Sequence, residues 1–436
     1  MADSRAAALS VLEKCRRSGA WSDAVLGSVL DAEGLQGRDR ALAAALSYGV
    51  VQNRMLLDHV IAQCATMPLR KIEPKVLDLL RITAYQLLRM DRVPAPAAVD
   101  SAVRLAKALG YGRAAGFVNA VSRRMASGAF QIPDGGSPEA LSVRYSHPLW
   151  LVRRLTELLG PEEAEAFCRC DNTPECITLQ VNTRKTDRET LLSALTSQGF
   201  DASAHPFVPD CIQLQSGNIL RIPEFQRGDF YVQDAAAKLS VLASGPKKDQ
   251  HILDACAAPG GKSFAAAILS GGAQITACDL HENKLTRIRA GAQRLGLEEL
   301  SLRAMDARQY CPEFDARFDL VIADVPCSGL GVIRKKPDIR YKEPGPLSAL
   351  PEIQSAILRN VKRYVKPGGA LLYSTCTVLP EENSAVVRAF LEENGEFSPE
   401  EFSLPGDLAS RDGMLQLWPQ RHGTDGFFIA KLRRTL

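Results

Sequence analysis

The stretch DACAAPGGKS, residues 254–263, decides the fold because it leads from an apolar run into a helical one through a glycine-rich turn. HILDAC before it reads as a strand, and SFAAAILS after it reads as a helix. Short apolar runs and helical stretches alternate from there onward, with further strands predicted in QITACDL, LSLRAMD, FDLVIAD and GALLYST. This alternation predicts a doubly wound, Rossmann-like α/β sheet. The tail MLQLWPQRHGTDGFFIAKL predicts an antiparallel hairpin, which completes a mostly parallel sheet of seven strands.

The part of the chain before this domain divides into two further segments. Residues 5–127 carry apolar positions at helical spacing, and Pro74 suits the first turn of the helix PKVLDLLRITAYQLLRM. The segment QIPDGGSPEA, residues 131–140, breaks this periodicity and marks a boundary. We therefore predict a multidomain protein, with an all-α bundle over 1–135, a small α+β linker domain over 141–245 and an α/β domain over 246–436.

Composition and cysteine usage indicate a globular protein of a reducing compartment. The 436 residues are 46% hydrophobic and 24% charged, and no apolar run approaches the length of a membrane span. The N-terminus lacks a signal-peptide pattern, and the 11 cysteines show no disulfide framework, so we expect a cytoplasmic protein. Cys168, Cys170 and Cys176 lack the spacing of a zinc site, and we expect no bound metal.

The charge of the chain is unevenly distributed. The net charge is +3, yet residues 1–130 alone carry +7, which leaves −4 for the remainder. A basic helical segment joined to a mildly acidic remainder favours contact of the front end with a polyanion. A solvated basic face with no partner is the alternative.

Acidic residues at strand ends predict the cofactor. Gly261-Lys262-Ser263 imitates a phosphate-binding loop, but that motif needs a glycine where this chain has Cys256, and the GxGxxG dinucleotide pattern is missing as well. Asp254, Asp279 and Asp306 end the first three strands, where ligands of such sheets bind. Three carboxylates around a glycine-rich turn favour a nucleoside with a cationic group, namely S-adenosylmethionine (SAM). Solvated strand-end acids are the alternative for any one of them.

Two cysteines also lie where strands end. Cys376 lies in LLYSTCTVLPEEN, residues 371–383, and Cys327 lies in ADVPCSGLG, residues 323–331. Either thiol is compatible with a buried apolar role, because free cysteine is among the most buried residue types. Their common position at the ligand-binding edge favours a chemical role.

Several motifs together resemble a known family. CAAPGGKS, ADVPCSGLG, RKKPDIR and YSTCT followed by EEN are similar to the motifs of the RNA cytosine-C5 methyltransferases, and RVPAPAAVD and AGFVNAVSRR resemble the NusB-like extension of the RsmB (Sun, or Fmu) subfamily. The resemblance covers essentially the whole chain, with a mild departure at SRRM, residues 122–125. It implies SAM-dependent transfer of a methyl group to C5 of a specific cytosine in 16S ribosomal RNA. The residues expected at the cofactor are Cys256, Ala257, Ala258, Pro259, Gly260, Gly261, Lys262, Asp279, Asp306 and Asp324.

The chemistry of this reaction accounts for the thiols. C5 of cytosine is a poor nucleophile, so a thiolate must first add to C6. Cations that favour a thiolate are available at Lys262 and at residues 334–336, and Asp324 can bind the base. The resemblance assigns the nucleophile to Cys376 and product release to Cys327. The residues alone do not show which cysteine is the nucleophile. DNA cytosine methyltransferases use the cysteine that follows proline, which here would be Cys327.

Other functions and partners remain open at this stage. The alternatives are a tRNA or DNA cytosine methyltransferase and a non-catalytic RNA-binding or antitermination factor. We expect a monomer whose substrate is free or partly assembled 16S ribosomal RNA. The loop IRKKPDIRYK is expected to contact the RNA backbone. Gln233 and Asp234 are expected to help frame the cofactor or target pocket.

Overall fold

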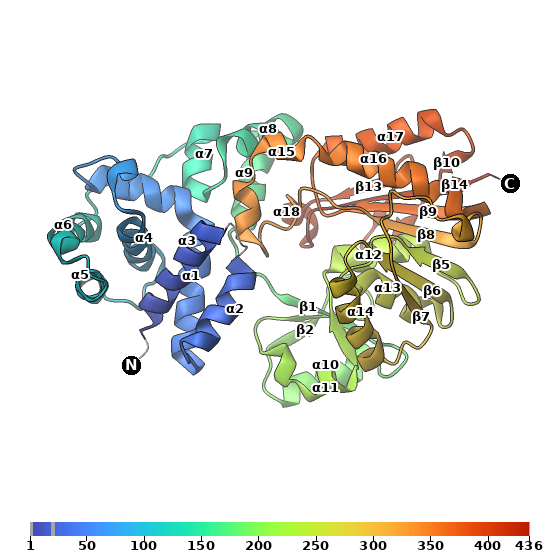
Figure 1. The fold of residues 1–436 in the computed structure, drawn as a ribbon, viewed down its shortest axis with the longest axis horizontal. Helices are drawn as coiled ribbons and strands as arrows, with labels where there is room; N and C mark the ends of the chain where they lie inside the picture. The colour runs from blue at the N-terminus through green and yellow to red at the C-terminus, as the bar shows by residue number, and fades with distance from the viewer. Residues whose placement is uncertain (1–2, 19–21, 436) are drawn as a thin grey trace. The chain divides into compact units, whose positions relative to one another are not determined.

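The computed structural model describes residues 3–18 and 22–435, traced in Figure 1. The chain forms two compact units, one of Met1–Thr173 with Ile333–Lys342 and the other of Pro174–Val332 with Glu343–Leu436. A ten-residue segment of the later sequence thus belongs to the N-terminal unit. None of the helices in the described ranges is both long and apolar enough to cross a membrane.

The N-terminal unit is helical, as predicted. Its main helices are α1 (Ser4–Ser18), α2 (Ser22–Ala32), α3 (Gly37–Cys64), α4 (Pro74–Arg89), α5 (Ala95–Ala108), α6 (Ala115–Ala126), α7 (Pro138–Tyr145), α8 (Leu149–Leu159) and α9 (Pro161–Cys170). Helix α4 begins at Pro74 as expected, and the Glu73 carboxylate caps it by accepting the Val76 N–H at 2.9 Å. Its apolar positions Val76, Leu80 and Ala84 are buried in the bundle core.

The second unit opens with a small antiparallel sheet. Four strands, β1 (Ile177–Val181), β2 (Ala202–Ala204), β3 (Cys211–Leu214) and β4 (Phe230–Val232), pair in the order β2-β3-β1-β4. Helices α10 (Arg188–Ser197) and α11 (Pro223–Arg227) and the short turn η3 (Ile219–Arg221) accompany it. The α+β character predicted for this segment is confirmed. The boundaries of the three predicted domains stay a prediction.

The large sheet follows the order β10-β14-β9-β8-β5-β6-β7, and β13 pairs with β14. Its strands are β5 (His251–Asp254), β6 (Gln274–Asp279), β7 (Leu300–Ala304), β8 (Phe318–Asp324), β9 (Val365–Thr375), β10 (Phe397–Pro399), β13 (Met414–Leu417) and β14 (Phe427–Arg434). Strands β5 to β9 are parallel, and the rest are antiparallel. The predicted count of seven is wrong, because β10 is an eighth strand. It has three residues, one of them proline and two exposed, so it carries no apolar run.

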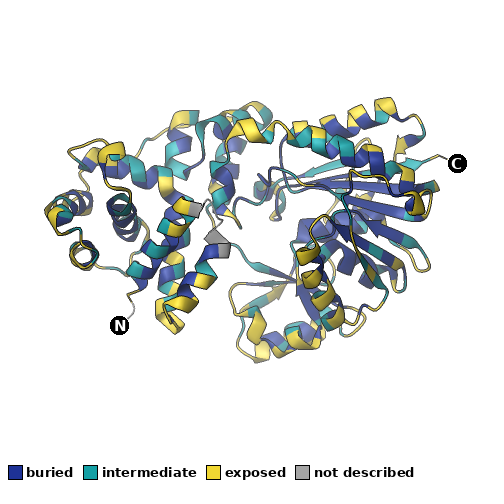
Figure 2. Cartoon of the chain, in the orientation of Figure 1, coloured by how far each residue is buried: buried dark blue, intermediate teal, exposed yellow. Residues whose placement is uncertain are grey.

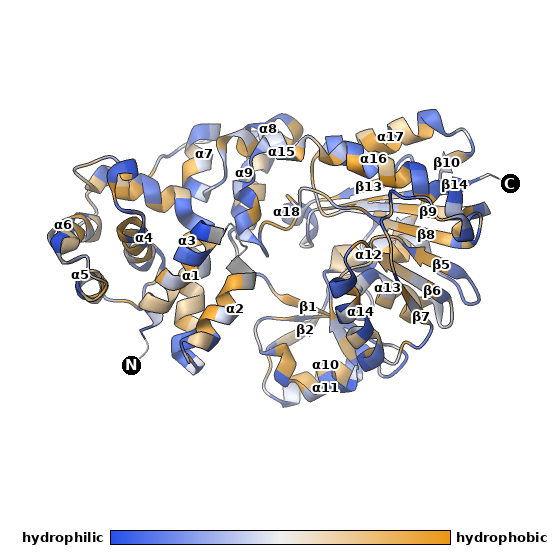
Figure 3. Cartoon of the chain, viewed as in Figure 1, coloured by the Kyte–Doolittle hydropathy of each residue, from blue (hydrophilic) through white to orange (hydrophobic). Residues whose placement is uncertain are grey.

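Alternation along the strands gives the large sheet two buried faces. Ile252 and Leu320 pack into the core cluster of α12 (Ala235–Ser244), α13 (Gly261–Ser270) and α14 (Glu282–Leu295). Their chain neighbours Leu253 and Val321 pack into the opposite cluster, with α16 (Leu350–Val361) and α17 (Ser384–Glu393). The strands are accordingly dark blue in Figure 2, and orange segments run along the central ones in Figure 3. The doubly wound fold is confirmed.

Candidate active site

Two glycines shape the turn between β5 and α13. Gly260 has φ +110°, and a Cβ atom there would lie 2.7 Å from Cζ of Phe264. A Cβ atom on Gly261 would lie 2.7 Å from Nε2 of Gln233. A Cβ atom at Gly260 would collide with the Phe264 ring of the following helix and would be strained by the positive φ. A Cβ atom at Gly261 would require the side chain of Gln233, which follows the small sheet, to shift.

A cavity of about 370 Å³, here called the strand-end cavity, lies beside the ends of β5 to β8. It brings together five of the residues predicted at the cofactor, Cys256, Ala258, Asp279, Asp306 and Asp324. Ala257, Pro259, Gly261 and Lys262 line a neighbouring cavity instead, and Gly260 lines neither. Sequence reasoning missed further lining residues, among them His281, Arg308, Pro326, Ile353 and Ile357. Ile353 and Ile357 are four apart on a helix, a spacing that by itself indicates only a core face.

Asp279 and Asp306 present carboxylates that the backbone or a neighbouring cation holds in place. Asp279 accepts the Ala258 N–H at 3.3 Å and the His281 N–H at 3.0 Å. Arg308 donates to both oxygens of Asp306, and this hydrogen bonding lowers the pKa of the Asp306 carboxyl. Both carboxylates are therefore fixed acceptors at the rim of the strand-end cavity.

Asp254, at the end of β5, is fully buried. Its Oδ2 accepts the Ser263 hydroxyl at 2.6 Å, whereas its Oδ1 has no hydrogen-bond partner among the described residues. Burial raises the pKa of this carboxyl to about 7. A buried carboxyl oxygen without a donor fits a cationic or N–H group of a ligand, because such a group would supply the missing bond.

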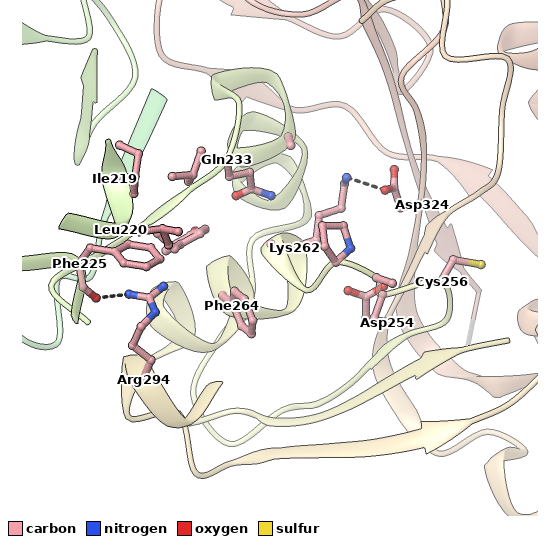
Figure 4. A pocket seen from close by; sticks show the side chains of 17 residues that line it. Ile219, Leu220, Phe225, Gln233, Asp254, Cys256, Lys262, Phe264, Arg294 and Asp324 are labelled. Carbon is pink, nitrogen blue, oxygen red and sulfur yellow. Dashed lines mark hydrogen bonds and ion pairs between the residues drawn. The ribbon is translucent and has the colours of Figure 1, made fainter. Parts of the chain in front are cut away.

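Lys262 and Asp324 form an ion pair across two elements of the large domain. The Lys262 ammonium lies 2.7 Å from Oδ2 of Asp324, as the dashed line in Figure 4 shows. Ser374 donates to Oδ1 of Asp324 at 2.8 Å, and this contact follows from the register that pairs the two residues across β8 and β9. The Asp324 side chain is 29% exposed and the lysine side chain 9%, so the carboxylate remains reachable from the cavities.

The two predicted cysteines meet beside this pair. Cys376 directly follows β9, and Cys327 lies three residues after the end of β8, which is the neighbouring parallel strand. Their Sγ atoms are 3.3 Å apart, and both side chains are partly exposed. The hydrogen bond to Cys376, together with burial, raises the pKa of the Cys327 thiol. Cys327 therefore keeps its proton and can donate it toward the sulfur of Cys376.

Glu382 holds the two cysteine loops together, and sequence reasoning gave it no role. Its buried carboxylate accepts the Ser328 N–H at 2.8 Å and the Gln354 amide at 3.0 Å, both at Oε2. The Thr377 hydroxyl lies 3.4 Å from its other oxygen and 2.6 Å from the Ser328 hydroxyl. Ser328, which follows Cys327, and Thr377, which follows Cys376, are thus hydrogen-bonded to the same carboxylate. The sequence signal that could have identified Glu382 is the acidic EEN that follows YSTCT, because it places an acid close to Cys376 in the chain.

Gln233 and Asp234, which were predicted to frame the pocket together, have different roles in the structure. Gln233 lines the neighbouring cavity. Asp234 caps α12, because its carboxylate accepts the Ala236 N–H at 2.7 Å, and it also accepts the Asp425 N–H at 3.1 Å. Its role in the structure is to hold the ends of two segments in place.

Part of the predicted RNA-binding loop is buried in the N-terminal unit. Arg340 has no exposed surface, and it donates to the Gln52 carbonyl at 2.9 Å and to Asn172 Oδ1 at 3.0 Å. The Tyr341 hydroxyl donates to the Val51 carbonyl at 2.7 Å. The expectation that this end of the loop contacts RNA is therefore wrong. The guanidinium of Arg340 instead anchors the segment 333–342 within the N-terminal unit.

Comparison with known proteins gives matches along the chain. Residues 241–433 match the family described as 16S rRNA methyltransferase RsmB/F, residues 2–127 match the NusB family, and residues 147–220 match the ferredoxin-like domain of RsmF/B-like methyltransferases. The probable ribosomal RNA small subunit methyltransferase B of Bacillus subtilis is 38% identical over 98% of each chain. The protein of the same name from Synechocystis is 34% identical over 100% of each chain.

Solved structures show the same fold. The crystal structure of PH0851 superposes with a TM-score of 0.80 at 27% identity, and it covers 95% of this chain and 94% of that one. A methyltransferase homologue from Pyrococcus horikoshii covers 69% of this chain and 100% of its own, with a TM-score of 0.60 at 28% identity. NSun6 from Pyrococcus horikoshii, solved with SFG, is 22% identical with a TM-score of 0.58 over 66% of this chain and 98% of that one, a likeness of fold alone.

Proposed function

The chain belongs to the ribosomal RNA small subunit methyltransferase B family, and we propose that it methylates C5 of one cytosine in 16S ribosomal RNA through a covalent adduct with Cys376. The observation that carries this proposal is the distance of 3.3 Å between the sulfurs of Cys376 and Cys327 beside the Lys262–Asp324 pair. An oxygen or nitrogen methyltransferase needs no thiol nucleophile, whereas addition to C6 of a pyrimidine does.

SAM fits the strand-end cavity. Asp279 is expected to bind the ribose hydroxyls, because its carboxylate lies at the end of the second strand. Oδ1 of Asp254 lacks a partner among the described residues, and Asp254 lines the neighbouring cavity, which meets the strand-end cavity at Cys256, Ala258 and Asp324. This oxygen is expected to accept a bond from the amino group of the ligand where the two cavities meet. When bound, SAM would supply an electrophilic methyl group.

The first step is addition to the target base. The thiolate of Cys376 forms a bond to C6, and the electron pair of the C5–C6 double bond moves toward C5. Cys327 supports the thiolate before the attack, because its thiol can donate to the Cys376 sulfur. Asp324, held by Lys262 and Ser374, is expected to accept a hydrogen bond from the exocyclic amine or from a protonated N3. Either bond draws electrons away from C6 and favours addition.

The last step restores the aromatic ring and frees the enzyme. Once Cys376 is bonded to C6, its charge no longer opposes ionisation of Cys327, so the pKa of the Cys327 thiol falls. Cys327 can then release its proton to water and take the C5 proton as a thiolate. The C5–H electron pair re-forms the C5–C6 double bond, and Cys376 leaves as a thiolate.

RNA binding is assigned to the N-terminal unit. Many basic side chains of this unit are exposed, among them Arg70, Lys71, Arg89, Arg92, Arg104, Lys107, Arg113, Arg123 and Arg124. Such a surface binds phosphates without reading sequence. We expect the substrate to be free or partly assembled 16S ribosomal RNA. Cytoplasmic location, the monomeric state and the absence of a metal stay predictions.

Bisulfite sequencing of ribosomal and transfer RNA, with and without the gene, tests the proposal. We expect one cytosine of 16S ribosomal RNA to lose its methyl group when the gene is removed. Loss at a tRNA cytosine alone would establish the tRNA alternative. An unchanged methylation pattern in both RNAs would favour the non-catalytic RNA-binding factor.

A further inference from the structure

A second cavity of about 530 Å³, here called the lateral cavity, begins at the Lys262–Asp324 pair. It runs from there to the small sheet, where η3, α11 and β4 form its far end. Figure 4 shows both ends, with Lys262 and Asp324 on one side and Ile219, Leu220 and Phe225 on the other. All lining residues belong to the second compact unit. The proposed chemistry uses only the end formed by Lys262, Asp324, Asp254 and the turn at 256–261, so the far end has no assigned role.

Apolar side chains at the far end are left open to solvent. Leu220 is 68% exposed and Val232 is 50% exposed, and both line the lateral cavity. Within the described ranges only four other large apolar side chains are exposed to a comparable degree. One of these, Leu280, lines the strand-end cavity. Exposed apolar side chains that gather around cavities indicate a binding surface.

Polar groups without partners lie along the same cavity. The hydroxyl of Tyr231 and Oε1 of Gln233 are buried and have no hydrogen-bond partner among the described residues, and Tyr231 is only 3% exposed. Burial raises the pKa of the Tyr231 hydroxyl, so this group remains a neutral donor. The guanidinium of Arg294 lies 3.8 Å from the centre of the Phe225 ring and donates to the Phe225 carbonyl at 2.6 Å. The lateral cavity therefore offers apolar side chains at its far end and, nearer to Gly261 and Phe264, a buried donor and a buried acceptor.

We propose that the far end of the lateral cavity binds a nucleobase of the RNA strand that carries the target cytosine, at a nucleotide next to the target. Leu220 and Val232 would pack against the face of this base, and Tyr231 and Gln233 would bond to its polar edge. The bases of single-stranded RNA are unstacked, so a protein can contact both their faces and their polar edges. The inference rests on the proposed function, because the cavity begins at the residues assigned to the target base.

The test measures RNA binding without methylation. The affinity of fluorescently labelled hexaadenylate for the full chain is compared between wild type, Leu220→Ala and Val232→Ala, with Ile132→Ala as the control. Ile132 is likewise exposed, at 41%, and lines none of the cavities described here. Each cavity variant should weaken binding about 5- to 20-fold, the effect expected from loss of two or three buried aliphatic carbons, and the control should not change it. Equal affinities for all four proteins would overturn the proposal.

A second measurement locates the base. Methylation is followed on a 16S ribosomal RNA fragment whose target is known from bisulfite sequencing, and one flanking nucleotide at a time is made abasic. One flanking abasic site should lower kcat/KM about tenfold for wild type and have little further effect on Leu220→Ala. Equal losses in both proteins at every position would contradict the proposal while leaving cytosine methylation intact. A raised KM for SAM in Leu220→Ala, with unchanged RNA binding, would assign the far end to the cofactor instead.

Tyr231→Phe separates edge recognition from packing. This variant keeps the ring against Phe264 and removes only the hydroxyl. It should reduce the difference in affinity between hexaadenylate and hexauridylate and leave SAM binding unchanged. An unchanged difference would remove Tyr231 from the proposed site.

Discussion

The Sγ atoms of Cys327 and Cys376 lie 3.3 Å apart, although the two residues are 49 positions apart in the chain. The parallel pairing of β8 and β9 produces this contact, because both cysteines follow the carboxyl ends of neighbouring strands. One sulfur can thus donate to the other, and both side chains remain partly exposed.

The two thiols should differ in what their removal does. Cys376→Ala should abolish methylation and form no adduct. Cys327→Ala should accumulate a protein–RNA complex, because C5 is methylated but the C5 proton is not removed. The measurement is denaturing gel electrophoresis after incubation with SAM and substrate RNA. A denaturation-resistant band with Cys376→Ala, and none with Cys327→Ala, would reverse the two roles.

Asp279→Ala should weaken SAM binding strongly. Loss of a charged bond to the ribose costs about 1.5–3 kcal/mol, which corresponds to a Kd about 10- to 150-fold higher. Isothermal calorimetry measures the change. Lys284→Ala is the matched control, because its ammonium lies 3.5 Å from Asp279 but is half exposed, and its loss should change Kd by less than about fivefold. Undiminished binding by Asp279→Ala would refute the ribose assignment.

The stability of the protein should fall as the pH rises through the titration of Asp254. The pKa of this carboxyl is about 7 in the folded chain and about 3.8 when it is solvated, so between these values the folded state binds one proton more than the unfolded state. Stability then decreases with pH by up to about 1.4 kcal/mol per unit. Thermal unfolding at pH 5, 6 and 7 should show this decline for wild type and a smaller one for Asp254→Asn. Parallel curves for both proteins would contradict the assignment.

Glu382→Gln should lower kcat without changing the KM for SAM. The amide keeps one neutral oxygen, which can accept the bonds from Ser328 and Gln354 only without the strengthening negative charge, and its nitrogen cannot accept the bond from Thr377. The link between the two cysteine loops should therefore weaken. We expect a 10- to 100-fold loss in kcat, with a decrease in melting temperature of several degrees. The control is Glu381→Gln, which changes the exposed neighbour. A normal rate of adduct formation in Glu382→Gln would show that the carboxylate is not needed for positioning.

The N-terminal unit should bind RNA mainly through charge. Replacement of Arg104, Lys107 and Arg113 by alanine should weaken binding of the full chain to 16S ribosomal RNA fragments. It should also make the slope of log Kd against log salt shallower by about two to three. Filter binding between 50 and 300 mM salt measures both. An unaltered slope would show that these side chains do not contact phosphates.

The sequence predicted those parts of the site that depend on where strands end. Cys327, Asp324 and Cys376 come together because a parallel sheet aligns the carboxyl ends of its strands, and the apolar runs marked those ends. Pairs formed by tertiary packing could not be predicted. Gln354 reaches the carboxylate of Glu382 from a separate helix, 28 positions earlier in the chain. The burial of a residue by distant backbone cannot be read from a local pattern either.

Arg340 illustrates this limit. Within RKKPDIR it looks like a surface cation, yet its partners are carbonyl and amide oxygens about 170 to 290 positions earlier in the chain. The unpaired polar atoms of Tyr231 and Gln233 could not be predicted either, because an alternating strand pattern does not show whether a buried polar atom has a hydrogen-bond partner. The eighth strand was missed for a different reason, since β10 is too short to carry a pattern.

The return of Ile333–Lys342 to the N-terminal unit has a consequence for anyone who exchanges parts between relatives. A chimaera that takes residues 1–173 from another species but keeps the native residues 333–342 would set Arg340 and Tyr341 against foreign backbone. A buried guanidinium that misses its acceptors is costly, so such a hybrid should express poorly even when both halves are sound. Transplanting the ten-residue segment together with the helices should restore it. The structural unit that must be exchanged as a whole is therefore discontinuous in sequence, and a single crossover point would split it.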